Sequence, residues 1–238
     1  LGVEVTQARV DRLDQGADAV TVAGVRARYA VGADGLHSTV RRLAGLEGRP
    51  ARRPRYGLRR HFAVRPWSDL VEVHWRPGFE LYVTPVGDEV VGVAVLGRRG
   101  LDLAAAIEQV EPVRAQLAGT QPLDEVRGAG PLRQRARART GGRVALVGDA
   151  AGYVDALTGE GLAVGFASAR ELVAAVERSD LPAYERGRLR TARTSRLITE
   201  GLVGLAGSPL RGGVVPAASA APSVFGFVVE ALARPVLP

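Results

Sequence analysis

The chain has 238 residues, of which 46% are hydrophobic, and a formal net charge of +7. This length can bury a substantial core in one or two domains. The absence of cysteine excludes disulfides and thiolate chemistry, and three scattered histidines argue against a metal site. No apolar run reaches the length of a transmembrane helix, so we expect a cytoplasmic protein without stable membrane insertion.

The positive charge does not by itself indicate a nucleic-acid partner. The chain lacks lysine, asparagine and methionine, and it is rich in alanine, glycine, valine, proline and arginine, as GC-rich codon usage produces. Arginine runs occur at 52–62 and 133–139, but no recognisable nucleic-acid module accompanies them. We therefore predict no nucleic-acid partner, although one or two arginines could attract an anionic nicotinamide cofactor or substrate.

The N-terminal part predicts strands followed by a short helix. Residues 1–25 read as β-structure, with apolar and polar residues in alternation. Residues 29–42, YAVGADGLHSTVRR, predict a short strand, a turn at Asp34 and Gly35, and a brief helix with Ser38 as its N-cap. By itself this segment is equally an ordinary capped helix after a turn.

The middle of the chain predicts an antiparallel sheet and then helices. Apolar residues recur with period two in three segments: 71–75, 81–83 and 91–95. With a turn at 87–88, this pattern predicts antiparallel strands with one covered face. Residues 101–119 predict a helix that Pro112 splits into two.

Residues 143–162, RVALVGDAAGYVDALTGEGL, are the most informative segment. The run 144–147 is typical of a parallel strand covered on both faces. Asp149 follows at the carboxyl end of that strand, where open α/β sheets bind ligands and a carboxylate can accept hydrogen bonds from a polyol. Gly159 and Gly161 would let backbone N–H groups approach a planar ligand. Alone, the segment could also be an ordinary strand-turn-helix unit.

Helices are predicted for much of the remaining chain. The first runs over about 160–176, and five apolar residues form one stripe along it: Leu162, Phe166, Ala169, Val173 and Val176. Residues 184–198 predict an arginine-rich helix. For residues 201–238 we prefer a packed terminal helix after a flexible loop. A lid over a substrate cavity, an oligomer contact and a helix with a membrane-facing side are alternatives.

Two motifs follow one another about a hundred residues apart. The first is the spaced set Asp34, Gly35, Ser38 and Arg41, and the second is GDAAG at 148–152. The pair indicates a protein family more specifically than either motif alone. Together they resemble the paired fingerprints of the para-hydroxybenzoate-hydroxylase superfamily of FAD-dependent oxidoreductases. The segment GDAAGYVDALTGEGL is most similar to the geranylgeranyl-reductase-like branch, whose relatives include monooxygenases. The resemblance covers roughly residues 20–177.

The resemblance implies an α/β (α+β) fold, with a partial FAD-binding Rossmann-like domain, an inserted antiparallel-sheet substrate domain and C-terminal helices. The corresponding boundaries are 1–45 and 133–200 for the two parts of the FAD-binding domain, 46–132 for the substrate domain and 201–238 for a C-terminal helical tail. The family opens with a strand and a G-x-G-x-x-G turn, which this sequence lacks. We therefore expect that roughly a hundred residues, including the N-terminal βαβ unit, are missing from this polypeptide.

The resemblance also implies roles for residues of the GDAAG segment. Asp149 would bind the ribityl chain of FAD, and Gly148 and Ala150 would lie near the pyrophosphate. A five-residue segment would pass the pyrimidine edge of the isoalloxazine: Thr158, Gly159, Glu160, Gly161 and Leu162. Asp34 and Gly35 would face the pyrophosphate from the other side.

Two further sets of residues follow from the same resemblance. Arg41 would fix its motif rather than react. The middle sheet would carry the substrate pocket, with four candidate lining residues: Trp75, Phe79, Tyr82 and Pro85. Aromatic residues on strands are more often core than site, so packing is the alternative for each of them.

The implied cofactors are FAD and, as a transient co-substrate, NAD(P)H. We favour a monooxygenase acting on a hydrophobic or aromatic small molecule, because the middle sheet is short and no polyprenyl tunnel can be identified. Reduction of an isoprenoid-type alkene is the alternative. A halogenase needs a lysine, which is absent here, although it could lie in the missing segment. A basic binding protein without catalysis and an inactive flavoprotein remnant remain open, as do the catalytic residues and the oligomeric state.

Overall fold

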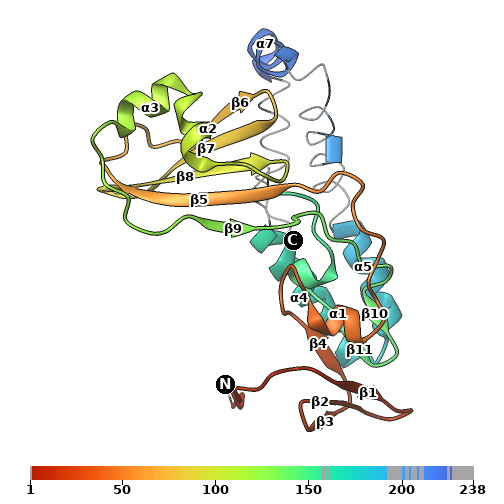
Figure 1. Ribbon diagram of the computed structural model, residues 1–238. Helices are drawn as coiled ribbons and strands as arrows, with labels where there is room; N and C mark the ends of the chain where they lie inside the picture. The colour runs from red at the N-terminus through yellow and green to blue at the C-terminus, as the bar shows by residue number, and fades with distance from the viewer. Residues whose placement is uncertain are drawn as a thin grey trace. The chain divides into compact units, whose positions relative to one another are not determined.

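The computed structural model in Figure 1 describes residues 2–156, 159, 161–191, 200, 201, 204, 208, 212–223 and 226. The chain divides into two compact units. One comprises residues 1–51, 134–201 and 222–238, and the other comprises residues 52–133 and 202–221. Helices, a parallel strand pair and antiparallel sheets occur together, which confirms the predicted α/β (α+β) class.

The first unit contains a small mixed sheet. Strands β4 (Ala30–Gly32) and β11 (Val144–Leu146) are parallel neighbours, and β10 (Thr140–Gly141) pairs with β11 in the antiparallel sense. All three residues of β11 are buried, as the prediction of a doubly covered parallel strand requires. In the described sheet, β4 is an edge strand and Val31 on it is 47% exposed.

The N-terminal residues contain fewer strands than the sequence predicts. Strands β1 (Leu13–Gln15), β2 (Val20–Val22) and β3 (Val25–Ala27) form an antiparallel sheet. Residues 2–12 form no strand, so the prediction of β-structure throughout 1–25 is wrong there. Val3 and Val5 are exposed, and an alternating pattern forms a strand only beside a partner strand and a core that its apolar side chains can cover.

The short helix after β4 forms as predicted. Helix α1 (Thr39–Leu43) begins after Ser38, whose hydroxyl oxygen accepts a hydrogen bond from the backbone N–H of Arg41 at 2.8 Å. This contact satisfies one of the free N–H groups of the first helical turn.

The long helix buries a different face from the one the sequence predicts. Helix α4 (Gly161–Glu177) packs with α5 (Leu181–Thr191) through Leu172 and Ala175, whereas Leu162 and Phe166 are 78% and 67% exposed. In the predicted stripe of Leu162, Phe166, Ala169, Val173 and Val176, three residues are exposed (Leu162, Phe166 and Val173), whereas Val176 packs against the buried cluster. Small side chains on the opposite face allow close packing against β11, and Ala145 lies in the same cluster.

The second unit is a five-stranded antiparallel sheet in the order β6-β7-β8-β5-β9. Its strands are β5 (Tyr56–Ala63), β6 (Glu72–Arg76), β7 (Phe79–Gly87), β8 (Val90–Gly97) and β9 (Arg127–Ala129). One face packs against α2 (Leu103–Glu108) and α3 (Glu111–Leu117), as Figure 1 shows. The turn between β7 and β8 and the break before Pro112 both match the prediction.

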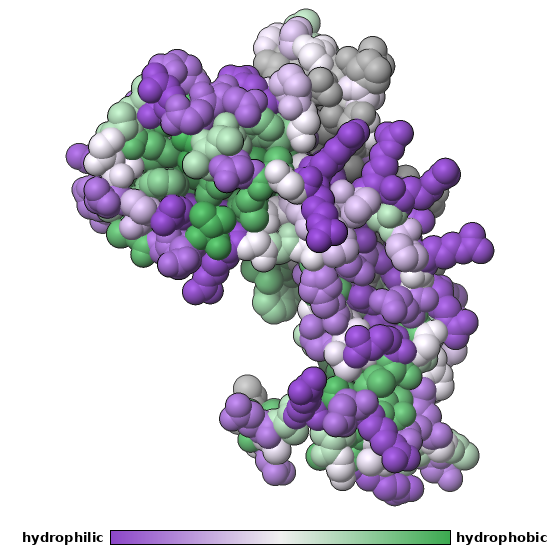
Figure 2. Space-filling model, in the orientation of Figure 1, coloured by the Kyte–Doolittle hydropathy of each residue, from purple (hydrophilic) through white to green (hydrophobic). Residues whose placement is uncertain are grey.

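The C-terminal predictions fall mostly outside the described residues. Helix α5 covers the start of the predicted segment 184–198, and α7 (Val214–Ala220) lies in the tail. Across the described parts of the chain, no helix is long and apolar enough to cross a bilayer. Figure 2 shows hydrophilic residues over most of the visible surface, in several areas rather than in a single patch.

Candidate functional site

The turn after β4 is organised by Asp34. The hydroxyl of Ser38 donates to Oδ1 of Asp34 at 2.5 Å, and the backbone N–H of Val40 donates to Oδ2 at 3.0 Å. Partial burial opposes ionisation, but these hydrogen bonds outweigh it and lower the pKa of Asp34. Gly35 has a φ of +76°, and no atom lies within 4 Å of the position that a Cβ would take. The carboxylate thus holds the turn, while Gly35 leaves backbone open beside it.

Arg41 joins this turn to the GDAAG segment. Its side chain is 1% exposed, and Nη1 donates to the carbonyl oxygen of Ala150 at 3.0 Å. Nη2 donates to the carbonyl oxygen of Leu36 at 3.0 Å and to Oε1 of Gln134 at 3.3 Å. A guanidinium enclosed by these acceptors is fixed in place, so Arg41 connects two segments that lie far apart in the sequence.

Strand β11 leads directly into a 3-10 turn, η1 (Gly148–Ala151). Gly148 has a φ of +60° and open space at its Cβ position. Asp149 is half-buried, and burial raises the pKa of its carboxyl group. Among the described residues, no hydrogen bond to the Asp149 carboxylate is formed, so its oxygens remain available to hydroxyl groups of a ligand.

The start of α4 lies against η1. A Cβ on Gly165 would lie 3.8 Å from Cα of Gly148, which is ordinary van der Waals contact, so the helix lies directly against the turn. Gly159 has a φ of +71° and open space around it, and Leu162 is exposed. Of the predicted segment 158–162, Thr158 and Glu160 lie outside the described residues. Gly159, Gly161 and Leu162 therefore present accessible backbone near the helix N-terminus, which favours negative charge.

Sequence analysis missed Tyr153 and Gln134. The two residues exchange backbone hydrogen bonds at 2.9 and 3.0 Å, and Gln134 also contacts Arg41. Burial, followed by the charges of Asp149 and Asp155, raises the pKa of Tyr153 to about 12. Tyr153 thus stays protonated beside the GDAAG turn. Because Tyr153 directly follows the GDAAG motif, its position could have identified it as a site residue. Nothing in the sequence singled out Gln134.

Together these residues suit a phosphate-containing ligand with a polyol and a planar ring. Open glycine backbone, a helix N-terminus and an available carboxylate at the end of a parallel strand are the groups that such a ligand requires. The structure brings Arg41, Gly148, Asp149 and Ala150 together with the turn of Asp34 and Gly35.

The four candidate pocket residues do not share one face of the sheet. Val73 pairs with Tyr82, and Trp75 pairs with Glu80, so Trp75 and Tyr82 lie on the face away from α2 and α3. Phe79 belongs to the buried cluster between the sheet and these helices, and Pro85 pairs with Val91 of that cluster. Residues opposite one another in an antiparallel pair point to the same side, which explains the separation.

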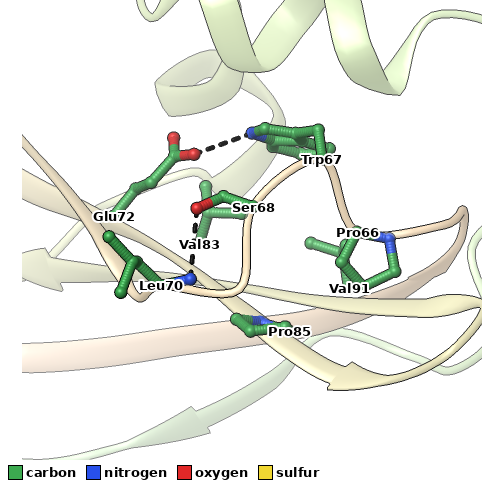
Figure 3. A pocket seen from close by; sticks show the side chains of 8 residues that line it. All are labelled: Pro66, Trp67, Ser68, Leu70, Glu72, Val83, Pro85 and Val91. Atoms are coloured by element: carbon green, nitrogen blue, oxygen red, sulfur yellow. Dashed lines mark hydrogen bonds between the residues drawn. The ribbon is translucent and has the colours of Figure 1, made fainter.

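A small hollow lies at Pro85, as Figure 3 shows. Oε1 of Glu72 accepts a hydrogen bond from Nε1 of Trp67 at 2.9 Å at its rim. The hollow encloses essentially no volume of its own, because the space that it outlines is largely open to solvent. Sites for small molecules usually enclose roughly 300–1,000 Å³, so this hollow is too small for an aromatic substrate.

Several solved structures have folds similar to that of this chain. The Diels-Alderase PyrE3 of pyrroindomycin biosynthesis has a TM-score of 0.74 and 23% identity over 95% of this chain and 54% of its own. The anhydrotetracycline hydroxylase OxyS from Streptomyces rimosus has a TM-score of 0.68 and 21% identity over 94% and 51%. The flavin-dependent brominase Bmp2 has a TM-score of 0.76 and 16% identity over 97% and 65%.

These likenesses show the fold, and this chain spans about half the length of the first of these structures. No curated protein matches the sequence. Residues 4–194 match the family described as FAD binding domain, a range that contains both motifs and the Arg41 connection between them. The chain therefore belongs to the FAD binding domain family, with FAD as its cofactor.

Proposed function

We propose that this chain forms part of an FAD-dependent monooxygenase that uses NAD(P)H and hydroxylates a hydrophobic or aromatic small molecule. The observation that carries the proposal is the half-buried carboxylate of Asp149, which lies at the end of β11 beside open glycine backbone and accepts no hydrogen bond from the described residues. OxyS is named as an anhydrotetracycline hydroxylase, and CabE, with 22% identity, as an aromatic hydroxylase, which supports this choice of reaction.

Bound FAD would supply the hydride acceptor and, once reduced, the reaction with oxygen. The chain would supply binding and positioning. Asp149 would accept hydrogen bonds from the ribityl hydroxyls, and backbone at Gly148 and Ala150 would lie near the pyrophosphate. Backbone N–H groups at Gly159, Gly161 and Leu162 would stabilise negative charge on the pyrimidine edge. Arg41 would act as a positioning residue through Ala150.

We further propose that a βαβ segment carrying a G-x-G-x-x-G turn completes this site. In the described sheet, β4 has one unpaired edge, and three large apolar residues of α4 are exposed: Leu162, Phe166 and Val173. Parallel sheets are normally covered on both faces, so an additional strand and helix would fit this surface. Such a segment would supply the other half of the pyrophosphate site.

The second candidate is reduction of an isoprenoid-type alkene, favoured by the similarity of residues 148–162 to the geranylgeranyl-reductase-like branch. It needs the same FAD site and differs in the partner of reduced FAD, which would be oxygen in hydroxylation and the alkene in reduction. Oxygen uptake in the presence of NAD(P)H, measured together with the product, distinguishes the two reactions, because hydroxylation consumes oxygen and alkene reduction does not.

The test of the FAD site is the flavin content of the full-length gene product after purification. We expect a yellow wild-type protein and loss of most flavin in Asp149→Ala, because the ribityl hydroxyls lose their acceptor. Asp11→Ala, which removes an exposed carboxylate of the same unit, should retain flavin. A folded wild-type protein that binds no flavin would disprove the proposal.

A further inference from the structure

A carboxylate, an imidazole and a guanidinium meet on β5 of the second unit. Oδ2 of Asp124 accepts hydrogen bonds from Nδ1 of His61 at 2.9 Å and from Nη1 of Arg59 at 2.8 Å. Oδ1 of Asp124 accepts the backbone N–H of His61 at 2.8 Å. The backbone bond, the imidazole and then Arg59 hold the pKa of Asp124 well below its usual range. The Asp124 side chain is therefore ionised and held in place by His61 and Arg59.

This anion selects one tautomer of His61. A carboxylate can only accept hydrogen bonds, so Nδ1 at 2.9 Å from Oδ2 must carry a hydrogen. Nη1 of Arg59 also lies 3.0 Å from Nδ1, but it has its own acceptor in Asp124. In the neutral imidazole, Nε2 then carries the lone pair, and Nε2 makes no hydrogen bond within the described part of the chain. The cluster thus presents a hydrogen-bond acceptor of fixed orientation.

His61 lies over a floor of small residues. Gly92 on β8 pairs with both His61 and Thr84, so these three residues form one row on the face away from α2 and α3. A Cβ on Gly92 would come within 3.1 Å of Cγ2 of Val86, 3.4 Å of Cδ2 of His61 and 3.7 Å of Nε2 of His61, so both side chains lie close over this glycine. In the next row, Ala94 separates Arg59 from Tyr82. The middle strand therefore carries only small residues between the polar residues of β5 and the aromatic residue of β7, and Val86 adds an apolar side chain beside His61.

The far side of this face is apolar. Val73 and Trp75 on β6 lie on the same side as Tyr82, and Val73 is exposed. Strand spacings of about 4.8 Å and a rise of about 3.4 Å per residue give a separation of about 12 Å between Cα of His61 and Cα of Tyr82. An aromatic ring system can therefore contact Tyr82 while its polar group reaches His61.

The charges near His61 favour an anionic group. Arg59 is half-exposed, and Arg127 on β9 pairs with it across the sheet and is exposed. Asp124 neutralises only one of these two guanidinium groups. A negative oxygen beside His61 is therefore stabilised by the remaining positive charge.

We propose that this face binds an aromatic or enolic hydroxyl compound, with Nε2 of His61 as the acceptor of its hydroxyl proton. The proton moves from the hydroxyl oxygen to Nε2, which leaves a phenolate or enolate beside Arg59 and an imidazolium whose Nδ1–H is bound to Asp124. No electrons are exchanged in this step. Asp124 is the positioning residue, since it touches His61 and not the ligand. That this ligand is the enzyme's substrate rests on the function proposed above, whereas its binding does not.

The test uses 4-nitrophenol, whose phenolate is yellow and whose neutral form is colourless. The probe is added to the full-length protein at a pH at which free nitrophenol is protonated, and difference spectra against protein without probe remove the flavin absorbance. We expect bound nitrophenolate with the wild type and at least a tenfold loss of its signal in His61→Gln. Asp124→Asn should cause a similar loss, because its amide can donate to Nδ1 and place the hydrogen on Nε2.

His74→Gln is the matched control. His74 also contacts a carboxylate, with Nε2 at 3.2 Å from Oε2 of Glu72, but it pairs with Leu81 and so lies on the other face of the sheet. This variant should give the wild-type signal. If wild type fails to bind the probe, binds it only as the neutral phenol, or gives the same phenolate signal as His61→Gln, the proposal is overturned.

Flavin content separates this result from the FAD proposal. His61→Gln should retain the flavin of the wild type, since His61 belongs to the second unit. A protein without flavin that still ionises nitrophenol would contradict only the proposed function. A flavin-containing protein that does not ionise it would contradict only the role of His61. If Asp124→Asn fails to fold, His61→Gln alone decides the outcome.

Discussion

Arg41 donates from Nη1 to the carbonyl oxygen of Ala150 at 3.0 Å, and this bond connects the helix of one motif to the turn of the other. Because the guanidinium is buried, water cannot replace its partners if it is lost. The relative position of the Asp34 turn and the Asp149 turn thus depends on one side chain.

Arg41→Lys should lower the free energy of unfolding by about 3 kcal/mol, because an ammonium cannot reach all three acceptors and leaves buried carbonyl groups unsatisfied. Urea denaturation monitored by circular dichroism measures the loss. Arg42→Lys, at the exposed neighbouring position, should change stability by less than about 0.5 kcal/mol. Equal effects of the two substitutions would show that the Arg41 contacts contribute little.

Gly148→Ala should weaken FAD binding at least about tenfold, because its methyl group enters space that we assign to the pyrophosphate. Gly24→Ala is the control: Gly24 has a φ of +80° and equally open surroundings, so both substitutions carry the same backbone strain of about 1 kcal/mol. Flavin titration followed by fluorescence measures affinity. Similar affinities for both variants would mean that FAD does not approach Gly148.

Asp149→Asn should stabilise the FAD-free protein at neutral pH. Burial raises the folded-state pKa of Asp149 above its unfolded value, so the native state binds more protons between these two values and loses stability as the pH rises through them. The amide removes this penalty. The gain in urea midpoint should therefore be present at pH 7 and shrink towards about pH 4. A variant that is less stable than wild type at pH 7 would contradict this explanation.

Tyr184→Phe should cost about 1–2 kcal/mol, because the buried hydroxyl donates to the carbonyl oxygen of Leu146 at 2.7 Å. The loss would appear in the thermal or urea unfolding of the first unit. Tyr29→Phe is a suitable comparison, since the Tyr29 ring packs in the same cluster and, among the described contacts, its hydroxyl donates no hydrogen bond. Its stability should stay within about 0.5 kcal/mol of the wild type.

Local patterns in the sequence predicted much of the fold. The Ser38 cap, the turn between β7 and β8 and the break at Pro112 each depend on residues within a few positions, and each forms as expected. The buried strand β11 was also evident from its uninterrupted apolar run. These elements can be predicted from short segments because helix capping, turn formation and the spacing of apolar residues each depend on neighbouring residues.

Long-range contacts could not be predicted in the same way. Asp124 lies 63 positions from His61, and nothing in either segment identifies the other as its partner. The apolar stripe on α4 follows from helical spacing alone, whereas the buried contact is made by Leu172 and Ala175. For the pocket candidates, composition could not reveal that Trp75 and Phe79 occupy opposite faces, because that depends on strand register.

The parallel neighbours β4 and β11 belong to two parts of the first unit, and residues 52–133 of the second unit lie between these parts in the sequence. A connection of this kind tolerates replacement, because doubling the length of a flexible loop adds only about 0.6 kcal/mol of closure entropy. Its ends need only to lie close together, and near them the backbone N–H of Gly48 donates to the carbonyl oxygen of Arg135 at 2.7 Å. Evolution could therefore exchange the intervening module for one of another size or chemistry while the cofactor-binding framework stays intact, so recombination at these two junctions is a route to new specificities.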